Sequence, residues 1–350
     1  SYTTYVHMDA KVNFDLEMFT KGLSGQIGFA FKGGGDKDID YSKNSTMYQA
    51  VTNDFTFFRQ AGDEVDTNGY SKYYTFCYSY EYFARLNYER TLRDHYFNAV
   101  AYANHRENIS RDVGGLNNIP YRSEFWGGNL YYSYKDRYIA SATLCYSGTG
   151  DFPTDHRFCF TPGFGLGWIV SNEGFLKDNK VVSFLKFRGN AGRTAREDFG
   201  QGRFSYKADI TVGTWDSGYM GNPTLRPEFV DAVDFGVDLT LFNRLSITAS
   251  RFKERVQNAY MVSTTYIPEF QGVALSNYTA RNSGKFVNVG YELGIDYIQP
   301  IGRNVTLTLG ASTSHNENEI QYIGETEKSE DYYERYATQG HPWGSIRGYR

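Results

Sequence analysis

The sequence of 350 residues has no apolar run that approaches the roughly 18 residues of a membrane-spanning helix, which excludes helical insertion into a bilayer. It also has no basic block: 36 Lys and Arg stand against 40 Asp and Glu, for a net charge of −4. This balance gives no electrostatic basis for binding nucleic acid. The mean hydropathy of −0.55 would place the chain among soluble proteins, but the residue pattern described next contradicts that placement.

Cysteine and proline are scarce, with 3 and 8 residues, whereas 31 Tyr, 26 Phe and 4 Trp make the chain 17% aromatic. A water-soluble core has little use for so many tyrosines, because each buried hydroxyl needs a hydrogen-bond partner. Tyrosine suits a membrane–water boundary, and transmembrane β-barrels carry aromatic girdles at both interfaces. Composition alone leaves open a second alternative, an aromatic-rich soluble β-sandwich.

Alternation with a period of two runs through the chain. Between residues 73 and 89 one face is apolar and aromatic while the other is mainly polar. The apolar positions are Tyr74, Phe76, Tyr78, Tyr80, Tyr82, Ala84, Leu86 and Tyr88. The same alternation recurs over 126–146, 233–249 and 287–297. This pattern predicts β-strands that separate two different media, one apolar and one wet.

The lengths of the connections alternate as well. Short turns are predicted near 20–22, 93–94, 135–137, 243–244 and 299–303, with a longer one at 171–180. Longer, glycine- and charge-rich connections are predicted at 33–71, 108–124, 148–156, 194–230 and 258–285. A soluble sandwich has no reason to sort its loops by end, whereas outer-membrane barrels have short periplasmic turns and long extracellular loops. We therefore predict an all-β fold, a transmembrane antiparallel up-and-down β-barrel with about twelve strands here.

The same reasoning predicts that residues 1–350 are part of one larger barrel domain. The first predicted strand (4–19) descends to a short turn and the last (304–314) ascends from one, so both chain ends fall on the extracellular side. Complete barrels of this kind keep both termini in the periplasm. Residue 1 is Ser rather than Met and the sequence shows no signal peptide, so we expect an excerpt of a longer polypeptide. A closed barrel of about twelve strands is the alternative.

Several motifs, in order over 119–349, resemble the SusC/RagA family of TonB-dependent transporters. They include Lys135-Asp136-Arg137-Tyr138, Phe164-Gly165-Leu166-Gly167-Trp168, Ser171-Asn172-Glu173-Gly174, Gly221-Asn222-Pro223 through Glu228, and Asn282-Ser283-Gly284. Residues 1–118 agree by strand pattern alone. The sequence departs from the family at Pro227, where Trp is usual, and at Gly189-Asn190-Ala191, where Ser-Tyr-Gly is usual. These departures fall at loop bases and bear on cargo more than on fold.

The resemblance implies a barrel of about 22 strands in the bacterial outer membrane, in contact with its lipid and lipopolysaccharide. An N-terminal plug and a TonB-binding segment, which couples to TonB–ExbB–ExbD, would lie outside this chain. A SusD-like surface lipoprotein would form the lid. The implied function is nutrient import, of oligosaccharide in most members and of peptide in some. The alternative is a SusC-like barrel that no longer transports and serves as a scaffold subunit of a surface complex.

Cargo contacts are predicted at aromatic residues of the long connections, because a ring can pack against the C–H face of a sugar. These residues are Trp215, Tyr219, Tyr260, Tyr266 and Tyr278. The alternative for each is packing within the loop or contact with the lid. The chain shows no convergent nucleophile–base motif, so no enzymatic activity is predicted.

Three further patterns admit a site, and for each we weigh a simpler alternative. Asp36, Asp38 and Asp40 alternate as in a calcium loop, but Tyr41 and Met47 replace the required Gly and Glu, which favours an acidic solvated loop without a metal or cofactor. Gly163, Gly165 and Gly167 are predicted to be strand glycines on the polar face rather than a phosphate cradle. Cys145 and Cys159 would lie opposite one another in a hairpin centred on Phe152, where an oxidising envelope would allow a disulfide.

Overall fold

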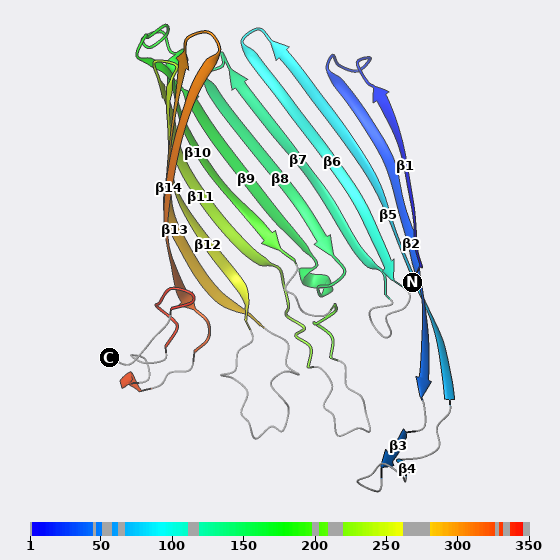
Figure 1. The fold of residues 1–350 in the computed structure, drawn as a ribbon. Coiled ribbons are helices and arrows are strands. Elements are labelled where there is room, and N and C mark those ends of the chain that lie inside the picture. The colour runs from blue at the N-terminus through cyan, green and yellow to red at the C-terminus, as the bar shows by residue number, and fades with distance from the viewer. Residues whose placement is uncertain are drawn as a thin grey trace. The chain divides into compact units, whose positions relative to one another are not determined.

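The computed structural model describes residues 2–44, 47–50, 58–61, 67–110, 119–197, 203–208, 220–261, 281–325, 329–331 and 337–345. Twelve of its strands form one sheet in the order β1-β2-β5-β6-β7-β8-β9-β10-β11-β12-β13-β14, and β3 and β4 form a separate hairpin (Figure 1). The order of the strands in this sheet is therefore their order in the sequence, as expected for the wall of an up-and-down β-barrel.

The strands of the large sheet are β1 (Tyr2–Asp15), β2 (Leu23–Asn44), β5 (Thr67–Leu92), β6 (His95–Ser110), β7 (Tyr121–Tyr134), β8 (Tyr138–Thr149), β9 (Phe158–Ile169), β10 (Val182–Arg196), β11 (Glu228–Leu241), β12 (Leu245–Met261), β13 (Arg281–Ile301) and β14 (Val305–Tyr322). The hairpin consists of β3 (Met47–Ala50) and β4 (Phe58–Ala61). Among the described residues, no helix has the length and apolar character needed to cross a membrane.

The chain divides into two compact units. The smaller unit contains residues 1–10, 29–82 and 106–121, and the larger contains 11–28, 83–105 and 122–350. The larger unit carries β8–β14 and every short turn between the strands of the sheet. Within it, the short turns of β7–β14 lie at the upper end of the view, and the strand ends that lead into the long connections lie at the lower end (Figure 1). The predicted sorting of connection lengths is confirmed.

The short turns are set by residues with left-handed backbone conformations. Lys135 and Asp136 have φ of 52° and 51°, and the Arg137 amide donates to the Tyr134 carbonyl at 3.0 Å. Phe242 and Asn243 repeat this arrangement with φ of 54° each. Positive φ at both central residues is the mark of a type I′ turn, whose twist matches that of the flanking strands. The turns thus fix the register of β7–β8 and β11–β12 locally.

One predicted connection is partly wrong. Of the loop expected at 33–71, residues up to Asn44 belong to β2, residues from Thr67 belong to β5, and β3 and β4 lie between them. Asp36 and Asp38 therefore lie on a strand and not in an acidic loop. The side chain of Asp40 lies outside the described residues. Charged and glycine-rich sequence can still pair by its backbone, so polarity alone did not indicate where these strands end.

The register places large apolar side chains on one face, here called the apolar face. Across β7–β9 its pairs are Trp126–Tyr146–Phe160, Leu130–Ala142–Phe164 and Tyr132–Ala140–Leu166. These side chains are not packed in a protein core: Phe164 is 56% exposed and Leu166 is 70% exposed. The opposite face of the same strands, here called the polar face, carries Ser141 and Thr143. Exposed apolar side chains on one face and polar ones on the other are the pattern of a transmembrane barrel wall.

Aromatic rings follow the apolar face next to the short turns. Tyr134 stacks on Tyr138 with ring centroids 6.5 Å apart, and Trp168 lies 6.3 Å from Phe187 on the adjoining strands. His95 also contacts Tyr132, its Nδ1 lying 2.8 Å from the phenolic oxygen. This row is the aromatic girdle that the sequence predicts beside the turns.

Candidate functional site

The polar face of β10 and β11 is lined by ion pairs. Arg188 Nη1 lies 2.7 Å from Asp234 Oδ1, and Arg188 Nε lies 3.6 Å from Asp238 Oδ1. The guanidinium lies over Gly236, where an added Cβ would come within 2.5 Å of Arg188 Cζ. A paired guanidinium needs such an uncrowded surface, which only glycine provides here. This sector of the polar face is suited to a wet or protein-filled interior.

The polar face of β7–β9 has a different character, because no charged residue occurs among its positions in these fully described strands. Its side chains are Tyr121, Ser123, Phe125, Gly127, Asn129, Tyr131 and Ser133 on β7, Ile139, Ser141, Thr143, Cys145, Ser147 and Thr149 on β8, and Cys159, Thr161, Gly163, Gly165, Gly167 and Ile169 on β9. Asn129 Nδ2 donates to Thr143 Oγ1 at 2.8 Å across the pair. We call this surface the neutral sector. Apart from Ser133, Thr149 and Cys159, which are buried, it presents hydroxyls, one amide and aromatic rings.

The predicted facing of the strand glycines is confirmed. Gly165 pairs with Ser141 and Asn190, and a Cβ there would lie 2.6 Å from Ser141 Oγ and 2.8 Å from Asn190 Oδ1. Glycine at this position leaves space for polar side chains on both neighbouring strands.

At the other end of the strands, the Gly221–Glu228 motif supports the base of a long connection. A Cβ on Gly221 would lie 2.2 Å from the Lys207 carbonyl carbon, so the two backbones can approach only with glycine there. The Asn222 amide donates to the Ser205 carbonyl at 3.0 Å, and Asn222 Oδ1 accepts from the Thr224 amide at 3.0 Å. The motif therefore ties residues 203–208 to the start of β11.

Asn282 joins this base to the next hairpin. Its Nδ2 donates to the Arg226 carbonyl at 2.7 Å and to the Asn258 carbonyl at 3.0 Å, while its Oδ1 accepts from the Arg226 amide at 3.0 Å. Asn258 has φ of 58° at a bulge in β12, and Arg226 Nη2 reaches its Oδ1 at 2.8 Å. The two family motifs, separated by about 56 residues, thus form one network. Arg226 lies within the Gly221–Glu228 motif, whereas Asn258 was not singled out from the sequence.

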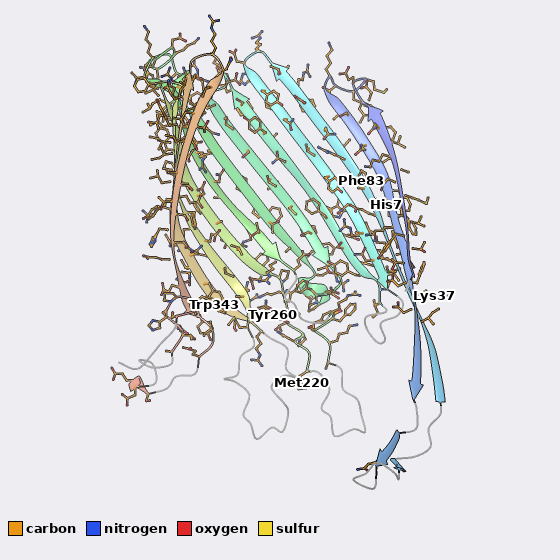
Figure 2. All side chains as sticks on the ribbon, viewed as in Figure 1. His7, Lys37, Phe83, Met220, Tyr260 and Trp343 are labelled. Atoms are coloured by element: carbon orange, nitrogen blue, oxygen red, sulfur yellow. The ribbon has the colours of Figure 1, made fainter. Side chains whose placement is uncertain are left out.

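Tyr260 is held at the same base. Its amide donates to Glu228 Oε2 at 3.2 Å, and Gly284 beside it lies where a Cβ would come within 2.7 Å of Ala259 Cβ. Figure 2 places Tyr260 and Met220 toward the lower end of the view, opposite the short turns. The other predicted cargo residues, Trp215, Tyr219, Tyr266 and Tyr278, lie outside the described residues.

A second buried group lies beside this base. Phe152 is 1% exposed and Phe204 is 6% exposed, and Arg203 joins their segments through Asp151 Oδ1 at 3.1 Å. Glu197, just beyond β10, accepts from Ser147 Oγ at 3.2 Å and from Cys159 Sγ at 3.7 Å. Burial raises the pKa of the Glu197 carboxyl, against the effect of these hydrogen bonds. No local pattern in the sequence indicates this group, because its members come from separate segments.

The predicted disulfide is not formed. The hairpin is centred one residue later than Phe152, so Cys145 pairs with Thr161 while Cys159 pairs with Ser147. The two cysteines are diagonal rather than opposite, and Cys77, Cys145 and Cys159 are all free thiols. A short helical turn at Thr154–His156 changes the register in a way that loop length does not reveal.

At the short-turn end, the family motifs meet around Glu173. Its carboxylate accepts from Tyr138 Oη at 2.7 Å, from Arg137 Nη1 at 3.1 Å and from Trp168 Nε1 at 3.2 Å. Hydrogen bonds from Tyr138 and Trp168, followed by the charge of Arg137, lower the pKa of Glu173. Nearby, Asn172 Nδ2 donates to the Asp136 carbonyl at 2.6 Å and Lys135 Nζ lies 3.6 Å from Asp94. This cluster, the rim clamp, explains why Lys135-Asp136-Arg137-Tyr138 and Gly167-Trp168 occur together.

No group of three or more His, Cys, Asp or Glu side chains in the described parts of the chain could hold a metal ion. The polar side chains in the clusters described above bind to one another. They form hydrogen bonds and ion pairs that join strands and loops.

A wall of up-and-down antiparallel strands, apolar on one face and polar on the other, defines an outer-membrane β-barrel. The model of the family described as TonB dependent receptor-like, beta-barrel matches residues 2–345, and the chain belongs to this family. Its members are proteins of the bacterial outer membrane, so the apolar face meets lipid. The family is one of transporters and receptors, not of enzymes.

The relatives agree with the SusC/RagA resemblance. TonB-dependent receptor P39 of Formosa agariphila is 27% identical over 231 residues, 63% of this chain and 21% of that protein. TonB-dependent receptor SusC of Bacteroides thetaiotaomicron is 26% identical over 220 residues, 59% of this chain and 21% of that protein. The chain therefore spans about a fifth of the length of these curated relatives.

The fold is also that of solved structures. The RagAB peptide importer in its closed-closed state superposes with a TM-score of 0.71 at 14% identity, over 97% of this chain and 40% of that chain. The outer membrane transporter YddB of Escherichia coli gives a TM-score of 0.52 at 10% identity, over 91% of this chain and 46% of that chain. The predicted fold class and family are confirmed.

Proposed function

We propose that the full-length receptor containing this segment imports an oligosaccharide across the outer membrane. Import would be driven by TonB–ExbB–ExbD through a TonB-binding segment and a plug supplied by the rest of the protein. A SusD-like surface lipoprotein would close the extracellular end. Family membership and the relative named SusC support this proposal. Peptide is the alternative cargo class, since the solved neighbour with the TM-score of 0.71 is described as a peptide importer.

The observation that favours a sugar is the neutral sector. Three adjacent strands offer hydroxyls, one amide and the rings of Tyr121, Phe125 and Tyr131, and carry no charged side chain of their own on this face. The carboxyl of Glu197, from beyond β10, adjoins only the end of the sector at Ser147 and Cys159. Hydroxyl and amide groups can donate to and accept from the hydroxyls of a sugar, and rings pack on its C–H faces. The charged termini or side chains of a peptide would find no opposite charge on these strand positions.

Uptake of labelled neutral oligosaccharides and labelled peptides by cells producing the full-length receptor tests the proposal. The double variant Ser141→Asp with Thr143→Asp places two carboxylates in the neutral sector. We expect oligosaccharide uptake to fall severalfold. The matched control, Ser246→Asp with Thr248→Asp, adds the same charge to the polar face of β12 near Asp296 and should preserve uptake.

If the receptor takes up peptides and no oligosaccharide, the proposed cargo is wrong and peptide takes its place. Uptake of neither class, with surface assembly of the lipoprotein lost when the receptor is deleted, would favour the scaffold function instead. Removal of the TonB-binding segment discriminates further, because import requires that segment and scaffolding does not.

A further inference from the structure

Three cations occur where the apolar face should be uniformly apolar. On β12, Leu245, Ile247 and Ala249 occupy the apolar face near the short turn, and the next positions on that face are Arg251, Lys253 and Arg255. All three cations are exposed. We call these three residues the basic ladder.

The neighbours of the basic ladder do not neutralise it. Arg251 lies between Phe235 and Tyr291, and Lys253 lies between Val233 and Val289. In the part of the chain that the structure describes, neither cation forms an ion pair. Their flanking positions on β11 and β13 are apolar, and the carboxylates of Glu317 and Glu319 lie one strand further away, on β14.

Arg255 has one carboxylate beside it, but that group already has other partners. Asp231 Oδ1 accepts from Arg193 Nε at 2.6 Å, and its Oδ2 accepts from Arg193 Nη2 at 2.9 Å and from Gln257 Nε2 at 2.8 Å. The region of the apolar face over β10–β12 therefore carries the basic ladder and Arg193 against the single carboxylate of Asp231.

The level of these charges matches the boundary of the membrane. Ten residues of strand tilted by about 40° rise about 25 Å, which is the height of the apolar band of an outer-membrane barrel. On several strands a charged or titratable side chain of the apolar face lies ten or eleven residues from the strand end at the short turn. These residues are Glu124 on β7, Arg193 on β10, Asp231 on β11, Arg255 on β12 and His315 on β14. Lys253 and Arg251 lie two and four residues closer to the short turn than Arg255, which is about 5 and 10 Å below that level, and their long side chains extend toward water.

We propose that the basic ladder binds the phosphate groups of an anionic glycolipid in the outer leaflet. Arginine binds phosphate with two parallel hydrogen bonds, and lysine adds a point charge. The apolar neighbours Val233, Val289 and Tyr291 would contact the acyl chains just below the phosphates. One lipid headgroup placed here would pair with Arg251 and Lys253, which form no ion pair within the described residues, and with Arg255, whose neighbour Asp231 already binds Arg193 and Gln257.

The test compares two triple variants of the full-length receptor purified in detergent. The ladder variant is Arg251→Gln, Lys253→Gln and Arg255→Gln. Its control is Lys177→Gln, Lys180→Gln and Arg303→Gln, which removes the same charge from exposed positions at the short-turn end. The probes are bisphosphorylated lipid A, its dephosphorylated form and inorganic phosphate, and the readouts are binding affinity and co-purified lipid by mass spectrometry.

Each Lys or Arg near an anionic lipid surface contributes about a fivefold gain in affinity, so the ladder variant should bind lipid A on the order of 100-fold more weakly. The control should bind like the unmodified receptor, and the dephosphorylated lipid should bind weakly to every form. Because glutamine is easier than a cation to place against lipid, the ladder variant is expected to fold, which heat-modifiable electrophoretic mobility checks. If it does not fold, the single variant Lys253→Gln is measured in its place, with an expected loss of about fivefold.

Equal affinity of the ladder variant and the unmodified receptor would overturn the proposal. So would displacement of lipid A by inorganic phosphate at equal concentration, which would indicate a free-phosphate site. A change of oligomeric state without a change in lipid content would assign the basic ladder to contact with a second copy of the chain, whose Glu317 and Glu319 lie on the apolar face of β14.

Discussion

Thr143 and Leu144 are adjacent on β8 and point to opposite faces of the sheet. Thr143 lies on the polar face and accepts a hydrogen bond from Asn129, whereas Leu144 lies on the apolar face and is 46% exposed. Both side chains are exposed in the isolated chain, so burial does not distinguish them. The distinction lies in the medium that each face meets. In this protein the outside is apolar and the inside is polar, the reverse of a soluble domain.

The largest effect is expected from placing a charge on the apolar face. Leu144→Arg should cost about 2–4 kcal/mol of folding free energy, because the guanidinium would meet lipid near the middle of the apolar band. Thr143→Arg, one residue away, should cost much less. Denaturant titration of the full-length receptor refolded into bilayers measures both. Equal penalties would remove the distinction between the two faces.

Breaking an ion pair on the polar face should have a smaller effect. Asp234→Ala leaves Arg188 without its 2.7 Å partner and should cost about 1 kcal/mol, since the pair is partly solvated. Asp238→Ala removes only the 3.6 Å contact and should cost less. The same titration compares them. A larger cost for Asp238→Ala would show that the pairing geometry of Arg188 is different.

The rim clamp lies at the turns, beyond the ends of the alternating strands. The stability that it contributes should depend on pH. Because the pKa of Glu173 is lowered in the folded state, its stabilising contribution is complete above the unfolded value of 4.5 and is lost as the pH falls through the lower folded value. Glu173→Gln should therefore destabilise the receptor at pH 7, and the difference from the unmodified receptor should shrink in acid. Unfolding midpoints across pH measure this, with Glu17→Gln at another short turn as the control. A constant difference at all pH values would contradict the ionised clamp.

The smallest changes in stability are expected when glycines of the polar face are replaced by alanine. A Cβ on Gly163 would approach Thr143 Cβ only at 3.9 Å, so Gly163→Ala should change stability by less than about 0.5 kcal/mol. Gly165→Ala should cost more, about 1 kcal/mol, because Ser141 and Asn190 must both move. Thermal unfolding of the two variants tests the order, and the reverse order would mean that the polar face is packed differently at these positions.

The sequence predicted the strands and short turns well because both signals are local. Alternation shows in any few consecutive residues, and the turns at 93–94 and 135–137 match the structure to the residue. The pairing of Cys159 with Ser147 could not be predicted, since it depends on a helical turn inside the connection. The extension of β2 to Asn44 was missed because backbone pairing continues where apolar alternation stops.

The site was less predictable than the fold. Glu173 lies within a quoted motif, but its role depends on Tyr138, which is 35 residues away, and no spacing rule links them. The Asn282–Arg226–Asn258 network likewise joins three segments through backbone groups that any sequence possesses. The basic ladder was readable in principle. It follows Leu245, Ile247 and Ala249 at the same spacing, and only the register shows that it stays on the apolar face.

The type I′ turns also bear on how such a wall is assembled. Two residues with left-handed backbone conformations align the two strands at Lys135 and Asp136 and again at Phe242 and Asn243. The register of each of these hairpins is therefore set locally, without contact from a distant segment. Hairpins can therefore be delivered to the bilayer one at a time in correct alignment. The long connections on the opposite side can then differ in length and sequence from one receptor to another without disturbing the insertion of the strands.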